Sequence, residues 1–118
     1  MLSLFNGMSC GAIALDMLNI EYEYYYSEID KYANKLTASL YPNAIALGDV
    51  RNIDVSKLPY IDVLIGGSPC QSFSFAGKRK GMATKCEIEI LKLDQYLELK
   101  ENNFEFEGQS YLFWEYIR

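Results

Sequence analysis

Apolar residues form short clusters along residues 1–65, and polar or glycine-rich stretches separate these clusters. Some clusters are short runs rich in β-branched or aromatic residues, which is typical of strands. In others the apolar residues recur every three or four positions, which is typical of helices. The pattern predicts strands at residues 1–5, 21–27, 44–47 and 61–65, helices at 12–18 and 30–40, and one helical turn at 54–58. Strands that alternate with helices indicate an α/β fold, in which helices cover the faces of a parallel sheet.

The same periodicity predicts which side chains face the core. Asp30 is expected to cap the second helix, because a carboxylate accepts hydrogen bonds from the first free N–H groups of a helix. The predicted inward residues are Ile13, Leu15 and Leu18 in the first helix, Tyr22, Tyr24 and Tyr26 in the second strand, and Tyr32, Leu36 and Leu40 in the second helix.

The alternation ends after residue 65. Residues 82–109 carry seven acidic and three basic side chains. Within them, 86–90 alternates like a hairpin strand and 93–101 is typical of a short helix, so we expect an acidic insertion at the surface. Residues 111–118 are typical of the opening turns of an amphipathic helix.

Composition narrows the possible classes of protein. The 118 residues suffice for one small domain, and no apolar run approaches the ~20 residues of a membrane span. Residues 1–5 lack the basic start of a signal peptide, so the expected location is the cytoplasm, where the three cysteines stay reduced. The absence of histidine excludes a Cys–His dyad and the zinc sites of nucleobase deaminases within these residues, and no metal site is expected.

A proline–cysteine loop directly follows the fourth predicted strand. The run Gly66-Gly67-Ser68-Pro69-Cys70 ends a β-branched segment, and ligand sites of open α/β sheets gather at the carboxyl ends of strands. A lone cysteine is usually a buried apolar residue, and we keep that interpretation for Cys10 and Cys86. Cys70 lies on a loop that has glycine at both ends, Gly67 and Gly77, and is instead a candidate nucleophile.

Three further loops follow the other strands. The first, residues 5–11, leads into a helix N-terminus that could hold an anionic group, although a plain tight turn is equally compatible. In the second, Glu28 could hold ribose hydroxyls or simply lie exposed beside the Asp30 cap. In the third, Asp49 could accept a hydrogen bond from an adenine amino group or form a local turn. Together, the three loops predict a cofactor that carries adenosine.

These motifs resemble, in order and spacing, the N-terminal part of a cytosine-5 DNA methyltransferase of bacterial or phage origin. Gly67-Ser68-Pro69-Cys70-Gln71 resembles the nucleophile motif, and residues 5–11 resemble the Phe-x-Gly-x-Gly-Gly cofactor loop, with departures at Asn6, Ser9 and Cys10. The resemblance implies a Rossmann-like methyltransferase fold with about four parallel strands in the order 3-2-1-4. It implies S-adenosylmethionine as cofactor, with these contacts: Phe5, Gly7, Met8, Ser9, Cys10, Gly11, Glu28, Ile29, Asp49, Val50, Pro69 and Leu112.

The resemblance also implies a mechanism on double-stranded DNA. The target cytosine is flipped out, Cys70 attacks ring carbon 6, and carbon 5 takes the methyl group before its proton is lost and Cys70 is expelled. The residues after the nucleophile would approach the DNA around the flipped base or its phosphates. The basic run at 78–80 is otherwise an ordinary solvated stretch, and the implied DNA contacts are Gln71, Ser74, Lys78, Arg79 and Lys80.

The 118 residues contain no Glu-Asn-Val, the family motif that supplies the acid, and no target-recognition region. We therefore expect a truncated chain that is inactive alone and that leaves the strand at 61–65 as an apolar sheet edge. Two interpretations stay open: a piece of a split methyltransferase that needs a second polypeptide, and a non-catalytic remnant that still binds the cofactor. A dinucleotide-dependent oxidoreductase would need a glycine pattern that is absent here.

Overall fold

A computed structural model describes residues 1–70, 90–106 and 108–118. The chain divides into two compact units, Met1–Gly67 and Ser68–Arg118, which we describe separately. The predicted hairpin strand at 86–90 lies almost wholly outside the described residues. No helix in the described ranges is long and apolar enough to cross a membrane.

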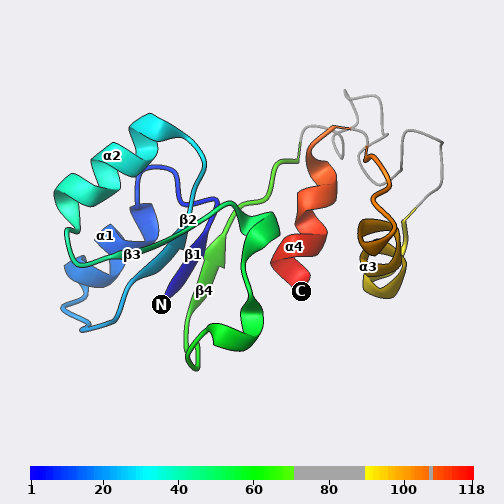
Figure 1. Ribbon diagram of the computed structural model, residues 1–118. Coiled ribbons are helices and arrows are strands. Elements are labelled where there is room, and N and C mark those ends of the chain that lie inside the picture. The colour runs from blue at the N-terminus through cyan, green and yellow to red at the C-terminus, as the bar shows by residue number, and fades with distance from the viewer. Residues whose placement is uncertain (71–89, 107) are drawn as a thin grey trace. The chain divides into compact units, whose positions relative to one another are not determined.

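The first unit is an α/β fold built on a parallel sheet (Figure 1). Its strands lie in the order β3-β2-β1-β4, which confirms the predicted order. Two short 3₁₀ turns, η1 (Val50–Asn52) and η2 (Val55–Lys57), precede the last strand, and the second of them matches the predicted helical turn. The main elements are β1 (Leu2–Leu4), α1 (Cys10–Met17), β2 (Tyr25–Ser27), α2 (Lys31–Leu40), β3 (Ile45–Gly48) and β4 (Leu64–Gly66).

One face of this sheet carries the tyrosine-rich core. Tyr24 and Tyr26 are 6% and 4% exposed and pack with Met1 and with Ala12 of α1. The rings of Tyr24 and Tyr41, which follows α2, meet edge to face with centroids 5.3 Å apart. The predicted alternation in the second strand is thus confirmed, and α1 and the end of α2 cover the same face.

The inward faces of the two helices agree only in part with the prediction. In α1, Ala12 is fully buried and the predicted Leu15 packs against the core, whereas Ile13 and Leu18 are 40% and 68% exposed. In α2 the predicted apolar stripe faces outward: Tyr32, Leu36 and Leu40 are 71%, 39% and 51% exposed. The buried residue of α2 is Thr37, which lies against polar side chains of the loop after β1.

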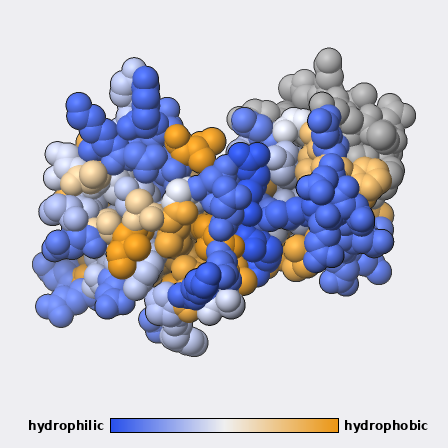
Figure 2. Space-filling view, viewed as in Figure 1, coloured by the Kyte–Doolittle hydropathy of each residue, from blue (hydrophilic) through white to orange (hydrophobic). Residues whose placement is uncertain are grey.

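Apolar side chains consequently remain on the surface of the first unit, where Figure 2 shows them in orange. In the described part of the chain, β4 pairs only with β1, and Val63 and Leu64 beside this edge are 38% and 43% exposed. The predicted apolar sheet edge is therefore present. β1, β2 and β4 are shorter than predicted, and residues 21–24 and 61–63 approach the sheet as irregular segments.

The second unit contains α3 (Leu93–Glu101), η3 (Ser110–Leu112) and α4 (Phe113–Ile117). The two predicted helices of this region are confirmed. Their core consists of Ile90, Tyr96 and Trp114. The buried Glu115 carboxylate accepts hydrogen bonds from the Tyr96 hydroxyl, Lys100 and Arg118, which joins α3 to α4.

Candidate functional site

The loop between β1 and α1 adopts an unusual backbone. Phe5, Gly7 and Ser9 all have positive φ values of 55°, 55° and 63°, in the left-handed region that favours glycine. A Cβ at Gly7 would meet nothing within 4 Å, so the conformation, rather than a lack of space, favours glycine there. At Gly11 the reason is different, because a Cβ would lie 2.9 Å from Ile65 Cδ1 of β4.

Buried polar side chains hold this loop in place. The Asn6 amide nitrogen donates to Ser9 Oγ at 3.1 Å and to Thr37 Oγ1 at 2.9 Å. The Tyr24 hydroxyl donates to Asn6 Oδ1 at 2.5 Å, and burial raises the pKa of Tyr24, which keeps the donor protonated. The sequence motif singled out neither Thr37 nor Tyr24 as part of the site, although Asn6 and Ser9 stood out as departures from the glycine pattern.

Glu28 connects this first loop to the second. Its carboxylate oxygen Oε2 accepts the Gly7 N–H at 2.7 Å, and Oε1 accepts the N–H groups of Ile29 and Asp30 at 2.8 and 2.9 Å. A carboxylate offers about four acceptor positions. Three are occupied by backbone donors here, which leaves about one for a ligand hydroxyl unless the Gly7 N–H is released.

The two acidic residues of the second loop, Glu28 and Asp30, accept hydrogen bonds from different backbone groups. Asp30 Oδ1 accepts the N–H groups of Tyr32 and Ala33 at 2.9 and 2.8 Å, so the predicted helix cap is confirmed. Glu28 is therefore not needed as the cap. Ile29, between the two acids, is 69% exposed, so its side chain is available to contact a ligand.

The third loop contains an interaction that the sequence did not predict. Asp49 accepts the Arg51 N–H at 3.0 Å and caps η1, which agrees with a local turn. Its two carboxylate oxygens also each accept a hydrogen bond from Arg51 Nε at 3.0 Å. A ligand amino group would therefore have to share this carboxylate with Arg51. The neighbouring Val50 is buried.

The loops after β1, β2 and β3 lie at one edge of the sheet because the strands are parallel. The residues predicted to contact the cofactor in these loops are thus brought together: Phe5, Gly7, Met8, Ser9, Cys10, Gly11, Glu28, Ile29, Asp49 and Val50. Among them, Met8 is 65% exposed. Cys10 is an exposed free thiol at the start of α1, so the interpretation of Cys10 as a buried apolar residue is wrong.

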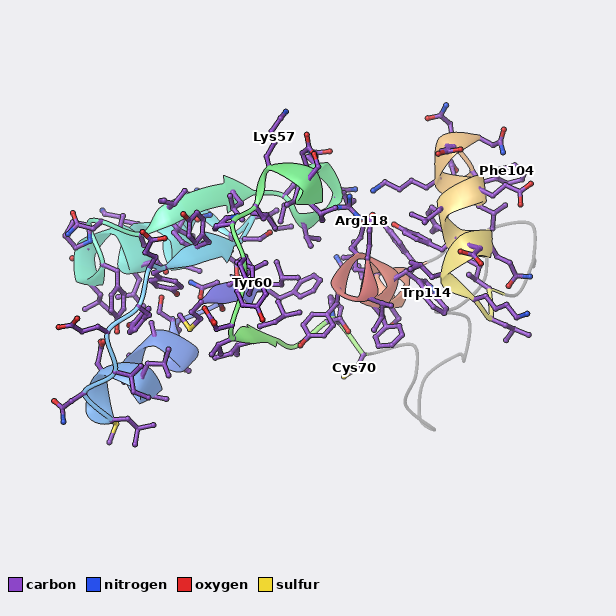
Figure 3. All side chains as sticks on the ribbon, turned by 90° about the horizontal axis from the view of Figure 1, so that it is seen from below. Lys57, Tyr60, Cys70, Phe104, Trp114 and Arg118 are labelled. Atoms are coloured by element: carbon purple, nitrogen blue, oxygen red, sulfur yellow. The ribbon has the colours of Figure 1, made fainter. Side chains whose placement is uncertain are left out.

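Cys70 follows β4 by four residues and belongs to the second unit. Its thiol is free and exposed, and it is the last described residue of this segment (Figure 3). Pro69 and Leu112, also in the second unit, are half-buried. The predicted DNA contacts lie outside the described residues: Gln71, Ser74, Lys78, Arg79 and Lys80.

A cavity of about 630 Å³ lies elsewhere in the first unit, and its lining includes Tyr22, Tyr41 and Asp16. Its other lining residues include segments that precede β2 and β3, so it opens at the amino edge of the sheet, opposite the three loops. Both tyrosine hydroxyls donate to the Asp16 carboxylate, at 2.8 and 2.7 Å. Among the described residues, no group of acidic or cysteine side chains is arranged to hold a metal ion.

Comparison with known proteins adds a family match. Residues 1–93 match the family described as C-5 cytosine-specific DNA methylase. The chain is 42% identical over 111 residues to the orphan methyltransferase M.Rho11sI of Bacillus phage rho11s, which covers 91% of this chain and 22% of that protein. It is 48% identical over 83 residues to the orphan methyltransferase M.SPRI of Bacillus phage SPR, covering 68% of this chain and 19% of that protein. The chain therefore spans about a fifth of the length of these curated relatives.

Proposed function

Because the chain belongs to the C-5 cytosine-specific DNA methylase family, we propose that its 118 residues bind S-adenosylmethionine and carry the nucleophile that attacks cytosine in DNA. The observation that carries the proposal is the Glu28 carboxylate, which joins the loops after β1 and β2 at the edge where Asp49 ends β3. Acidic residues at such positions suit the ribose and adenine of a nucleoside.

The residues present fit this cofactor. Gly7 has no side chain at the loop and open space beside it, so a ligand can approach the backbone. Glu28 would accept a ribose hydroxyl, Ile29 would pack on the adenine ring, and Asp49 would accept the adenine amino group. When bound, S-adenosylmethionine supplies an electrophilic methyl group.

Cys70 would act on the base. Its thiolate forms a bond to carbon 6 of a cytosine flipped out of double-stranded DNA, which makes carbon 5 nucleophilic. Carbon 5 would then accept the methyl group, and a base or a water molecule would take up its proton. The electron pair of that C–H bond restores the ring double bond and expels the Cys70 thiolate. The exposure of the Cys70 thiol suits attack on a base that arrives from solvent.

We further propose that these 118 residues are inactive alone and act with a second polypeptide that supplies an acid and a target-recognition region, in the cytoplasm of a bacterium or a phage-infected cell. The chain covers only about a fifth of each relative, so an acid and a target-recognition region would come from the counterpart of the remaining four fifths. A non-catalytic portion that keeps cofactor affinity is the competing interpretation.

A chimera distinguishes the catalytic from the non-catalytic interpretation. The chain replaces the matching segment of M.Rho11sI, and the product is incubated with S-adenosylmethionine and duplex DNA that contains 5-fluorocytosine. Carbon 5 cannot lose fluorine as it loses a proton, so the covalent adduct should accumulate and migrate as one species on a denaturing gel. Cys70→Ala should abolish the adduct, and Cys86→Ala, at a cysteine outside the predicted cofactor and nucleophile motifs, should leave it intact. An adduct that survives Cys70→Ala would exclude Cys70 as the nucleophile, and a chimera that binds S-adenosylhomocysteine without forming an adduct would favour the non-catalytic interpretation.

A further inference from the structure

Ser9 occupies a backbone conformation that costs energy for a residue with a side chain. Its φ and ψ of 63° and 28° lie in the left-handed region, where a Cβ crowds the backbone. Ser9 also stands at the N-cap of α1, yet its hydroxyl makes no capping hydrogen bond to the helix. The Ser9 hydroxyl must therefore be held by something else.

That partner is Thr37, which comes from the middle of α2. Ser9 Oγ and Thr37 Oγ1 lie 2.8 Å apart, and both residues are fully buried. The Asn6 amide nitrogen donates to both oxygens, at 3.1 and 2.9 Å. The three side chains form a closed triangle of hydrogen bonds. In it, Thr37 of α2 contacts both Asn6, near the start of the loop, and Ser9, at its end.

The triangle is also attached to the sheet. Asn6 Oδ1 accepts the Tyr24 hydroxyl at 2.5 Å, and the Asn6 N–H donates to the Ser27 carbonyl at 3.1 Å. With both ends of its amide occupied, Asn6 has a single orientation. Gly7, whose N–H binds Glu28, lies between the two anchored residues Asn6 and Ser9.

We propose that Thr37 is a positioning residue for the cofactor subsite: through Asn6 and Ser9 it holds the left-handed loop in the shape that presents Gly7 and Glu28 to the ligand. Thr37 is separated from the ligand by the loop that it holds. The proposal rests on the proposed function for its ligand, but the ordering of the loop by Thr37 is measurable without one.

The test compares Thr37→Val, which keeps the shape and removes the hydroxyl, with Thr37→Ser, which keeps the hydroxyl. Ser39→Ala, on the exposed side of the same helix, is the matched control. Affinity for S-adenosylhomocysteine is measured by calorimetry at 10 °C, after circular dichroism has established that the variant is folded at that temperature. We expect Thr37→Val to weaken binding about tenfold, from the loss of two buried hydrogen bonds, and Thr37→Ser to stay within about twofold of the parent chain.

Amide hydrogen exchange provides a second measurement, without ligand. Thr37→Val should accelerate exchange in residues 6–10 by about tenfold while the amides of β1 and β2 keep their rates. A chain that binds no S-adenosylhomocysteine would overturn the proposed function, and exchange would still decide the role of Thr37. If exchange accelerated uniformly across the sheet, Thr37 would stabilise the whole unit and would not act on the loop in particular, which would contradict the inference.

Two further results would also overturn the inference: unchanged affinity in Thr37→Val, or equal loss in Thr37→Ser. If Thr37→Val does not fold, Tyr24→Phe takes its place, because it removes the hydroxyl that holds the other end of Asn6. Loop-restricted acceleration in Tyr24→Phe would support the network, and unchanged exchange in the loop would contradict it.

Discussion

Replacing Glu28 with glutamine tests how one carboxylate joins two loops. Glutamine keeps one acceptor oxygen, which can still bind the N–H groups of Ile29 and Asp30. It places an NH₂ group opposite the Gly7 N–H, where Oε2 now accepts at 2.7 Å. A charge-assisted hydrogen bond is thereby replaced by two donors that face each other.

The expected cost follows from this geometry. A hydrogen bond to a charged group contributes about 1.5–3 kcal/mol, and partial exposure of Glu28 reduces this, so we expect Glu28→Gln to lower the free energy of unfolding by about 1–2 kcal/mol. For a domain of this size, each kcal/mol lowers Tm by about 4–8 °C. Affinity for S-adenosylhomocysteine should fall at least tenfold, because the remaining acceptor for a ribose hydroxyl is also lost.

Thermal unfolding and calorimetry measure the two effects on the same samples. Glu21→Gln is the matched control, since Glu21 is exposed and precedes the same strand at the opposite edge of the sheet. If Glu28→Gln unfolds at the parent temperature and binds S-adenosylhomocysteine with parental affinity, the carboxylate neither joins the loops nor faces the ligand, and the reasoning is wrong.

Two further predictions concern packing and pH. Gly11→Ala should destabilise the parent chain by about 1 kcal/mol, because its Cβ would meet Ile65 Cδ1 at 2.9 Å and Ile65 Cγ2 at 3.3 Å. In an Ile65→Ala background both atoms are gone, so Gly11→Ala should stabilise the chain through the helix preference for alanine. Urea unfolding of the four proteins measures the change of sign. Burial and a hydrogen bond to Asp16 raise the pKa of Tyr41 to about 12, and the same causes raise the pKa of Tyr22 further. The contribution of Tyr41 to stability is therefore complete below pH 10 and is lost as the pH rises through about 12, whereas that of Tyr22 is lost at higher pH. Absorbance titration at alkaline pH should show Asp16→Asn lowering both pKa values, and an unchanged titration curve would contradict these contacts.

The sequence predicted features of this fold that depend on local chemistry. Periodicity located the strands, the family resemblance implied their order, and the carboxylate of Asp30 marked the start of α2 correctly. The inward face of α2 was not predictable in this way. Apolar spacing favoured Leu36, whereas Thr37 turns inward because its partners are polar groups of a loop more than twenty residues earlier.

Some features of the candidate site could likewise be predicted from the sequence, and others could not. The positions of Glu28 and Asp49 at the ends of strands followed from their place in the sequence. The ion pair of Asp49 with Arg51 did not, because two residues that are near neighbours in a turn pair only when the backbone brings the guanidinium back over the carboxylate. A polar residue at a glycine position, as at Ser9, is the signal that could have directed attention to a buried hydrogen-bonding partner.

The central claim is that the loops after β1, β2 and β3 form one cofactor subsite. Titrating the isotope-labelled chain with S-adenosylhomocysteine, followed by two-dimensional amide NMR, tests it most directly. We predict saturable shifts for Gly7, Ile29 and Val50, with Tyr22 and Tyr41 at the opposite edge unchanged. Shifts confined to the opposite edge, or no shifts at millimolar ligand, would contradict the claim.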